Sequence, residues 1–380
     1  MCVTSYVLGD DAASWRALNI ARSLCDAGYR VTVRQYVRPE KLVTGRRRAL
    51  EIPGVSFEIA ITSRLGSILR HGWDVTRKGF DLVIGNNING GLFSILGCLS
   101  TPLVLDMHGN MVAELEMEHT WDGGSSVLDI EYRFRRVLYQ LADVTTRRIA
   151  DRVLCVSRAM MRELGSRGVQ EKKLVYVPNC VDLQFFRPRP MAETLKVRRD
   201  LGIDDDKFLV GYLGRLQSWQ GYEKFLEAAR NMGDPRLSFL IVGGDESGAD
   251  DTLHFVRSVP VDRMPSLYGA CNLLVLPRPD HPATRVAAPT KFAEYAAMGK
   301  PILTTNVGDA ADFVKAYACG LVVEDCSAPE LTRGIREMLS RSRHELAEMG
   351  HSSRHLAEAE FNLEVARKSL SGCVESLVGR

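Results

Sequence analysis

The chain has 380 residues, of which 45% are hydrophobic and 25% are charged, and its formal net charge at pH 7 is +2. This length allows two domains of ordinary size, and the composition is typical of a soluble globular protein. The balanced charge argues against a nucleic-acid-binding protein. No apolar run approaches the ~20 residues that cross a membrane. The N-terminal segment lacks the basic start of a signal peptide, so we expect a cytoplasmic protein.

The cysteines and histidines do not indicate a metal site. The nine cysteines are odd in number and form no C-x-x-C pair, which favours small core residues in a reducing compartment over disulfides or zinc ligands. His351 and His355 are four residues apart, a spacing that could place two ligands on one helix face. Their neighbours are Ser, Arg and Ala, so a solvated face is the better interpretation. We expect no metal and no resident cofactor.

Strand-like and helix-like segments alternate along the first half of the chain, which predicts a parallel sheet covered by helices on both faces. The expected strands are 5–8, 29–34, 55–59, 81–85, 102–106, 152–156 and 174–177, and the expected helices are 12–27, 90–99, 128–150 and 157–164. The stretch 112–129 is acidic and contains Gly and Ser. We predict a mobile loop there.

A turn-rich passage at 178–190 contains three prolines and is predicted to link two domains. After it the alternation restarts, with expected strands at 208–213, 237–242, 254–256, 272–277, 301–305 and 321–323. The expected helices are 222–231, 262–270, 289–298, 308–317 and 329–340, followed by an amphipathic segment at 361–377. The pattern predicts two doubly wound α/β domains, 1–183 and 184–360, with a terminal helix at 361–380. Ligands of such sheets bind at the carboxyl ends of the strands, and two facing domains create a cleft for them.

The segment Pro289–Pro301 reads as a short helix with clear start and stop signals. Pro289 suits the first helical position, Gly299 suits a left-handed stop, and Pro301 prevents continuation. Ala288 offers no side-chain oxygen to cap the first amides, and uncapped amides at a positive helix end suit a phosphate. Lys291 and Glu294 share a face, where they could meet a phosphate and sugar hydroxyls. The alternative is a buried helix with two solvated charges.

Two glycine-containing strand ends precede this helix. In Gly211-Tyr-Leu-Gly-Arg215, glycine lets the backbone approach a ligand and the planar fork of Arg215 can clamp a diphosphate; the alternative is a turn with an exposed arginine. In Ile241-Val-Gly-Gly-Asp-Glu246, Gly243 could pack against a base or ribose, although a plain turn is equally compatible. This second stretch is not G-x-G-x-x-G, which argues against a nicotinamide site. Trp219 could stack on a ligand, but a core position is the better interpretation.

Two features in the first half could contact an acceptor. His108 follows a strand, in Asp106-Met-His-Gly109, where a neutral imidazole could bind a hydroxyl or a phosphate; a structural histidine is the alternative. Gly9, Asp10 and Asp11 follow the first strand. Their acidity disfavours phosphate, so an acceptor hydroxyl is the better hypothesis.

Three longer motifs resemble the retaining glycosyltransferases of family 4 (glycosyl transferases group 1), which have the two-domain GT-B fold. They are Val175-Tyr-Val-Pro-Asn-Cys-Val-Asp-Leu-Gln-Phe-Phe-Arg-Pro188, Gly211-Tyr-Leu-Gly-Arg-Leu216 and Pro289-x-Lys-x-x-Glu-Tyr-x-x-x-Gly-Lys-Pro301. Arg152-Val-Leu-Cys-Val-Ser157, Asp106-Met-His-Gly109 and the segment from Phe361 are also similar to that family. The resemblance covers nearly the whole chain.

The resemblance implies two Rossmann-like domains facing a cleft, with the terminal helix crossing back onto the first domain. It implies a nucleotide-sugar donor held mainly by the second domain, without a required metal. The implied donor-binding residues are Gly214, Arg215, Gln220, Gly243, Arg257, Val259, Ala287, Ala288, Thr290, Lys291 and Glu294. Glu294 would bind the ribose hydroxyls, and Arg215 with the amides of 288–291 would hold the diphosphate. His108, Arg215 and Lys291 would be catalytic, and Gly9, Asp10, Asp11 and His108 would contact the acceptor.

Two positions depart from the family pattern. The usual E-x7-E pair is incomplete because Val286 stands eight residues before Glu294. Gln220 stands where the family has a phosphate-binding lysine, a loss for which Lys291 could compensate. The stretch from Ala288 to Glu294 is similar to a small-Pro-x-Lys-x-x-Glu version found in some relatives.

The sequence therefore favours a transferase that moves a hexose or N-acetylhexosamine from a UDP- or GDP-sugar to a hydroxyl of a glycan, a lipid-linked sugar or a small metabolite. A non-catalytic GT-B subunit that binds a nucleotide sugar or a partner, and a UDP-sugar 2-epimerase, are the alternatives. The expected partners are the nucleotide sugar and the acceptor, and no nucleic acid. Arginines of the long helix could also attach the first domain to an anionic membrane surface, although a solvated helix face is the simpler interpretation. These arginines are Arg133, Arg135, Arg136, Arg147 and Arg148.

Overall fold

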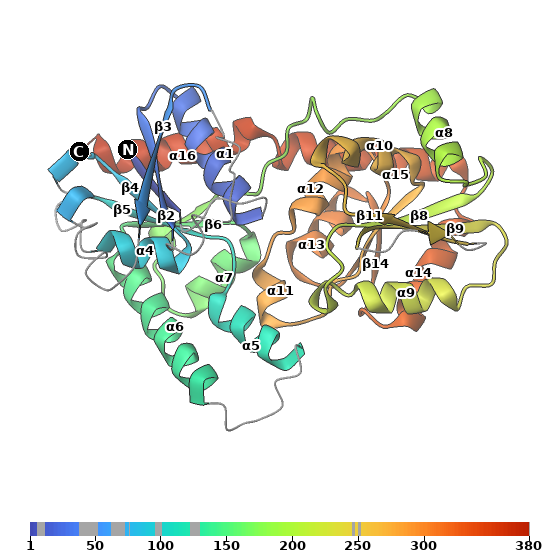
Figure 1. Ribbon diagram of the computed structural model, residues 1–380, viewed down its shortest axis with the longest axis horizontal. Helices are drawn as coiled ribbons and strands as arrows, with labels where there is room; N and C mark the ends of the chain where they lie inside the picture. The colour runs from blue at the N-terminus through green and yellow to red at the C-terminus, as the bar shows by residue number, and fades with distance from the viewer. Residues whose placement is uncertain are drawn as a thin grey trace. The chain divides into compact units, whose positions relative to one another are not determined.

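The computed structural model describes residues 1–5, 12–37, 52–61, 73–75, 77–95, 101–121, 130–244, 248–249 and 252–379. The chain divides into two compact units, shown in Figure 1. Unit 1 comprises Met1–Pro178 and Leu363–Arg380, and unit 2 comprises Asn179–Asn362. Both units are α/β folds built on a parallel sheet.

The sheet of unit 1 has the order β3-β2-β1-β4-β5-β6-β7, and each neighbouring pair of these described strands is parallel. The strands are β1 (Cys2–Ser5), β2 (Val31–Val37), β3 (Val55–Ile61), β4 (Val83–Asn86), β5 (Leu103–Met107), β6 (Arg152–Cys155) and β7 (Leu174–Tyr176). The sequence predicted seven strands close to these positions. The order reverses between β1 and β4, so the carboxyl ends of these strands form the switch point where such folds bind ligands.

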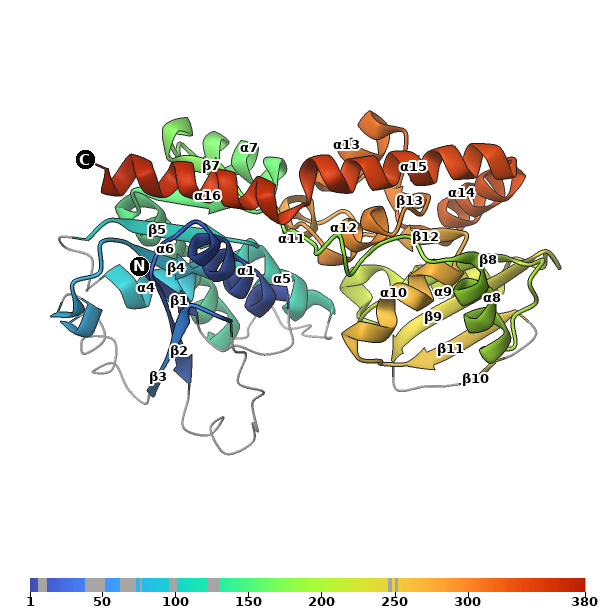
Figure 2. The same ribbon diagram turned by 90° about the horizontal axis from the view of Figure 1, so that it is seen from above.

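Helices cover both faces of this sheet. They are α1 (Ala12–Asp26), α4 (Asn87–Ile95), α5 (Met111–Trp121), α6 (Ile130–Ile149), α7 (Arg158–Ser166) and α16 (Leu363–Val378), with a short 3-10 helix η1 (Glu171–Lys173). Ser157 starts α7, because its side chain accepts a hydrogen bond from the amide of Met160 at 2.9 Å. Figure 2 shows α16, the last helix of the chain, which packs against α1 and β7.

The prediction of a mobile loop at 112–129 is wrong for its first part, which forms α5. Asn110 caps this helix: its Oδ1 accepts from the amide of Ala113 at 3.1 Å, and its carbonyl accepts from the amide of Glu114 at 2.8 Å. The glutamates that made the stretch look like a loop are good helix formers. One of them, Glu116, pairs with Arg136 of α6 at 2.6 Å. Residues 122–129 lie outside the described part of the chain.

The sheet of unit 2 has the order β10-β11-β9-β8-β12-β13-β14. The strands are β8 (Phe208–Leu213), β9 (Leu237–Gly244), β10 (Gly248–Ala249), β11 (Leu253–Arg257), β12 (Leu273–Leu276), β13 (Ile302–Thr305) and β14 (Gly320–Val323). Neighbouring strands are parallel, except for the antiparallel pair of β10 and β11. The switch point lies between β8 and β12.

Unit 2 has a hydrophobic core on each face of its sheet. Its helices are α8 (Met191–Asp200), α9 (Tyr222–Arg230), α10 (Met264–Ala270), α11 (Pro282–Val286), α12 (Thr290–Ala297), α13 (Gly308–Tyr317), α14 (Ala328–Ser340) and α15 (Arg343–Glu360), with 3-10 helices η2 (Ser218–Gln220) and η3 (Val261–Arg263). Leu209 and Leu213 of β8 pack in one core, and the intervening Val210 and Tyr212 pack in the other. The strands read as continuous apolar runs because both faces are buried. Nowhere in the described chain is a helix both long enough and apolar enough to cross a membrane.

Candidate functional site

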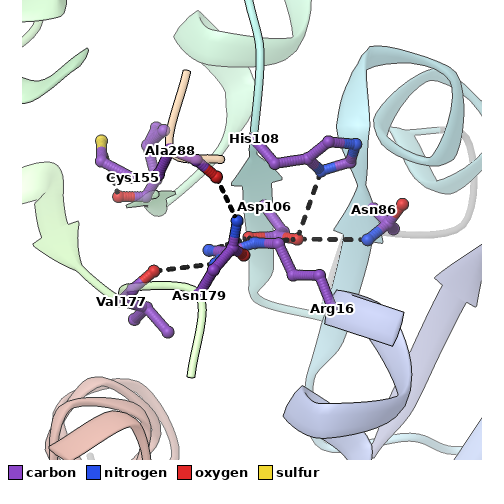
Figure 3. Close-up of polar contacts among 9 residues, drawn as sticks. Arg16, Asn86, Asp106, His108, Cys155, Val177, Asn179 and Ala288 are labelled. Atoms are coloured by element: carbon purple, nitrogen blue, oxygen red, sulfur yellow. Dashed lines mark hydrogen bonds and ion pairs between the residues drawn. The ribbon is translucent and has the colours of Figure 1, made fainter. Parts of the chain in front are cut away.

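The start of α12 is the centre of the candidate site in unit 2. The helix begins at Thr290, one residue later than predicted, and Gly299 ends it with a φ of +64°. Among the described residues, no side chain caps its first amides. The carbonyl of Ala288 accepts a hydrogen bond from Nδ2 of Asn179 at 2.7 Å, which fixes the approach to the helix (Figure 3). The positive helix end therefore remains suited to an anion.

Glycines at the ends of β8 and β9 allow two backbones and one side chain to meet beside α12. Gly214 has a φ of +137°, and its amide donates to the carbonyl of Val242 at 2.9 Å. A Cβ on Gly243 would lie 2.1 Å from the carbonyl oxygen of Gly214. A Cβ on Gly214 would lie 2.8 Å from Nζ of Lys291. The two glycines thus make room for the Lys291 ammonium at the carboxyl edge of the sheet.

Lys291 is half-buried, which contradicts the alternative of a solvated charge. Its Nζ lies 4.5 Å from the centroid of the Tyr212 ring and donates to the Tyr212 hydroxyl at 3.4 Å. That hydroxyl in turn donates to the carbonyl of Arg215 at 2.9 Å. Burial, reinforced by the nearby charge of Arg278 and opposed by Glu294, lowers the pKa of Lys291 to about 7. A bound anion would favour the charged form of this lysine.

Glu294 lies one turn further along α12 and is also half-buried. Its Oε2 accepts a 2.6 Å hydrogen bond from the hydroxyl of Tyr268, which is almost fully buried. Burial raises the pKa of Glu294, although the Tyr268 hydroxyl and Lys291 act in the opposite direction. Tyr268 therefore orients the carboxylate through one oxygen. Within the described chain no hydrogen bond to the other oxygen, Oε1, is found, so that atom can accept from a ligand hydroxyl.

Sequence reasoning missed both Tyr268 and Arg278. Tyr268 lies on α10, and no local pattern connects it with Glu294. Arg278 lies two residues after the end of β12 at the switch point, a position that could have identified it. Its guanidinium carbon lies 5.4 Å from the centroid of the Trp219 ring, and the Thr305 hydroxyl donates to its carbonyl at 2.5 Å. Trp219 is half-buried under this cation.

The remaining predicted donor residues lie at the same edge of the unit 2 sheet or beside it. Arg215 is exposed just after β8, and Arg257 is exposed at the end of β11, where it pairs in register with Gly244 of β9. Val259, two residues further along the chain, is half-buried. Gln220 ends η2, and its Oε1 is buried without a hydrogen-bond partner among the described residues. The residues leading into α12 and its first residue, Ala287, Ala288 and Thr290, are half-buried.

Val286, which replaces a glutamate of the family pattern, ends α11 and is 2% exposed. It fills a core position, and a carboxylate there would need a partner. The buried position of Val286 therefore explains why an apolar residue stands there in place of a glutamate.

Unit 1 contains a separate polar cluster at the end of β5, drawn in Figure 3. Asp106 is fully buried and accepts from Nε and Nη2 of Arg16, at 2.9 Å and 2.7 Å to Oδ1. Nδ2 of Asn86 donates to its Oδ2 at 3.1 Å, and Nη1 of Arg16 donates to the carbonyl of Val177 at 2.8 Å. Burial alone would raise the pKa of Asp106, but Arg16 and His108 hold it below its usual value.

His108 lies beside this cluster. Its Nδ1 lies 3.7 Å from Oδ2 of Asp106, too far for a hydrogen bond, and among the described residues it has no hydrogen-bond partner. The nearby negative charge favours a proton on Nδ1, which leaves Nε2 as an acceptor. Three of the four predicted acceptor residues, Gly9, Asp10 and Asp11, lie outside the described residues. The fourth, His108, is described. The part of the chain described here contains no group of three or more His, Cys, Asp or Glu residues that could hold a metal ion.

Comparisons with known proteins match both halves of the chain. Residues 193–355 match the family model described as Glycosyl transferases group 1, and residues 13–185 match Glycosyltransferase Family 4. The alpha-galactosylglucosyldiacylglycerol synthase of Streptococcus pneumoniae is 27% identical over 33% of this chain and 37% of that protein. The putative colanic acid biosynthesis glycosyl transferase WcaI of Escherichia coli K12 is 27% identical over 54% of each chain. The matched regions thus span about half or less of these curated relatives.

The same fold occurs in solved structures. The Anabaena protein Alr3699/HepE, crystallised in complex with UDP, aligns over 99% of both chains with a TM-score of 0.75 and 17% identity. The resemblance at this identity concerns the fold.

The buried Asp106–Arg16 pair predicts a large stability effect. Asp106→Asn should lower the free energy of unfolding by about 3–5 kcal/mol, because it leaves the buried guanidinium of Arg16 without its counter-charge. Urea denaturation of the purified protein measures this change. Asp26→Asn, at an exposed ion pair with Arg22, is the matched control and should change stability by less than about 1 kcal/mol. Equal effects of the two substitutions would contradict the assignment.

Proposed function

This chain belongs to the family 4 glycosyltransferases of the GT-B fold, and from that membership we propose that it transfers a sugar from a nucleoside diphosphate sugar to a hydroxyl acceptor, with retention of the anomeric configuration. The observation that carries the proposal is the constellation in unit 2. An uncapped helix end, the Lys291 ammonium and the oriented Glu294 carboxylate lie together at the switch point of the sheet. These groups match a diphosphate and the ribose attached to it.

The donor is a UDP- or GDP-linked hexose or N-acetylhexosamine. The amides at the start of α12, Lys291 and Arg215 hold the diphosphate, and Oε1 of Glu294 accepts from a ribose hydroxyl. Gly243 and the end of β11, with Arg257 and Val259, receive the nucleoside. HepE, a structural neighbour of this chain, was solved with UDP, which supports a nucleotide ligand for this fold.

The site acts by stabilising the leaving group. When the bond between the sugar and the diphosphate breaks, negative charge builds up on the diphosphate oxygens. Donors that are fixed before the reaction stabilise this charge more than they stabilise the ground state. Loss of one such donor typically slows a reaction by about 10²–10³-fold. His108, with Nε2 as acceptor, takes part in the transfer step at the sugar or acceptor hydroxyl.

The acceptor is a hydroxyl of a glycan, of a lipid-linked sugar or of a small metabolite. The relatives from Streptococcus pneumoniae and Escherichia coli are named for the synthesis of a galactosylglucosyldiacylglycerol and of colanic acid, which supports the first two of these classes.

A second candidate function is a subunit that binds a nucleotide sugar without turning it over. The buried Val286 and the neutral Gln220 favour it, because both stand where the family usually has a charge. Binding without turnover distinguishes this candidate from the transferase.

The first experiment screens the purified protein against UDP- and GDP-sugars by thermal shift, and then measures donor hydrolysis and transfer. A ligand at about 100 times its Kd stabilises by ~2.7 kcal/mol. Glu294→Gln should weaken donor binding by roughly 10–100-fold, because it replaces a charged acceptor of a ribose hydrogen bond. Glu227→Gln, at an exposed glutamate of α9, should leave binding unchanged. No stabilisation by any nucleotide sugar would refute the proposal, and epimerised UDP-sugar as the product would reassign the reaction.

The lowered pKa of Lys291 predicts a pH-dependent affinity for UDP. The free protein loses the ammonium charge as the pH rises through about 7, and a bound diphosphate raises this pKa. Binding therefore requires proton uptake above that pH. Calorimetric titration between about pH 7 and pH 9 should show the affinity for UDP falling by roughly tenfold or more. The phosphate of UDP, with a pKa of about 6, is already ionised over this range, so its titration does not cause the change.

Lys291→Gln should bind UDP weakly and with little pH dependence over this range. The control Lys224→Gln, at an exposed lysine of α9, should keep the wild-type profile. A wild-type affinity that stays flat from pH 7 to pH 9 would contradict the account in which a half-buried Lys291 of lowered pKa contacts the diphosphate.

A further inference from the structure

The long helix α6 of unit 1 carries an exposed apolar stripe. Ile130 is 82% exposed, Phe134 63% and Leu141 61%. The stripe consists of Ile130, Phe134, Val137, Leu138, Leu141 and Val144, all exposed, and Ile149 at the end of the helix is 45% exposed as well. Within the stripe, the spacings from the first residue are 4, 7, 8, 11 and 14 positions, which place these residues on one face of a helix. With 20 residues, the helix is about 30 Å long.

The opposite face of α6 packs on its own unit and is the more polar of the two. The buried residues of this face are Ala142, Asp143, Thr146 and Arg147. Arg147 donates one hydrogen bond to each carboxylate oxygen of Asp143, at 2.9 Å and 2.6 Å. The Tyr132 ring stacks on His119 of α5 at 3.9 Å. An amphipathic helix of a globular domain normally turns its apolar face inward. In α6 the apolar face points outward.

Basic side chains border this apolar stripe. Of the five arginines on the helix, Arg147 is buried in its ion pair and Arg136 is paired with Glu116. The other three, Arg133, Arg135 and Arg148, are exposed, and across the described ranges no carboxylate forms an ion pair with them. Glu131 is the exposed acid of the same helix, so three exposed arginines stand against one glutamate and the exposed charge beside the stripe is predominantly positive.

We infer that the apolar stripe of α6 docks unit 1 onto an anionic membrane surface. A helix that lies in the plane of a bilayer interface buries its apolar face at the acyl boundary and holds arginines at the level of the headgroups. The main alternative is a second copy of this chain. A two-fold contact through α6 would bring three exposed arginines and one exposed glutamate, Glu131, of each copy together, so like charges outnumber opposite ones and oppose such an interface.

Vesicle flotation with the full-length protein tests this inference without donor or acceptor, so its outcome is independent of the proposed activity. Wild-type protein should bind phosphatidylcholine vesicles that contain phosphatidylglycerol, and binding should weaken at high salt. Phe134→Ser/Leu141→Ser should bind on the order of 100-fold more weakly, because each large apolar side chain contributes about tenfold or more. Both residues are exposed, so the melting temperature should not fall.

Two further variants serve as comparisons. Met191→Ser/Val261→Ser removes apolar side chains that are 73% and 53% exposed in unit 2, and it should bind vesicles like the wild type. Arg133→Gln/Arg148→Gln should lose the preference for phosphatidylglycerol over pure phosphatidylcholine.

Three results would overturn the inference. The first is wild-type protein that does not float with anionic vesicles. The second is equal binding to vesicles with and without phosphatidylglycerol. The third is a dimer in sedimentation equilibrium that Phe134→Ser/Leu141→Ser converts to a monomer without any vesicle binding, which would assign the stripe to a second copy.

Discussion

The candidate donor site depends on a close approach that glycine alone permits. At the carboxyl edge of the unit 2 sheet, any side chain on Gly243 would collide with the carbonyl of Gly214, and one on Gly214 would displace the ammonium of Lys291. This clearance places a half-buried lysine against the strand ends, beside the first turn of α12. The lowered pKa of Lys291 follows from that position, since the ammonium has lost water without gaining a strong counter-charge. In the proposed function, a bound diphosphate would supply this counter-charge.

In both units a buried group lies next to a less buried candidate side chain. In unit 2, the buried hydroxyl of Tyr268 holds one oxygen of Glu294. In unit 1, the buried Asp106, itself fixed by Arg16 and Asn86, faces Nδ1 of His108. Asp106 lies near the carboxyl end of β5, where ligands of doubly wound sheets bind. Preorganised groups of this kind are what charge stabilisation in a transition state requires.

Much of the fold could be predicted from the sequence, because strands buried on both faces read as apolar runs, and Pro289 and Gly299 delimit α12 within one residue. The spacing of Lys291 and Glu294 on one helix face was enough to identify both residues as functional candidates. Their partners could not be found in this way, since Arg16 contacts Asp106 across 90 residues and Tyr268 reaches Glu294 across 26. The acidic composition of 112–129 hid α5. Periodicity also reveals that α6 has an apolar face, but only packing shows that this face points outward.

The most direct test of the central claim is the affinity of UDP for Gly214→Ala, measured by isothermal titration calorimetry. A methyl group at this position meets the flexible end of Lys291 rather than backbone, but the φ of +137° also strains any L residue, so a thermal melting curve must first show that the variant folds. Gly202→Ala is the control for a methyl group added at a positive φ, because Gly202 has a φ of +71° and the added group would meet no atom within 4 Å. The account predicts affinity at least about tenfold lower for Gly214→Ala and unchanged for Gly202→Ala. Wild-type affinity in a folded Gly214→Ala variant would contradict it.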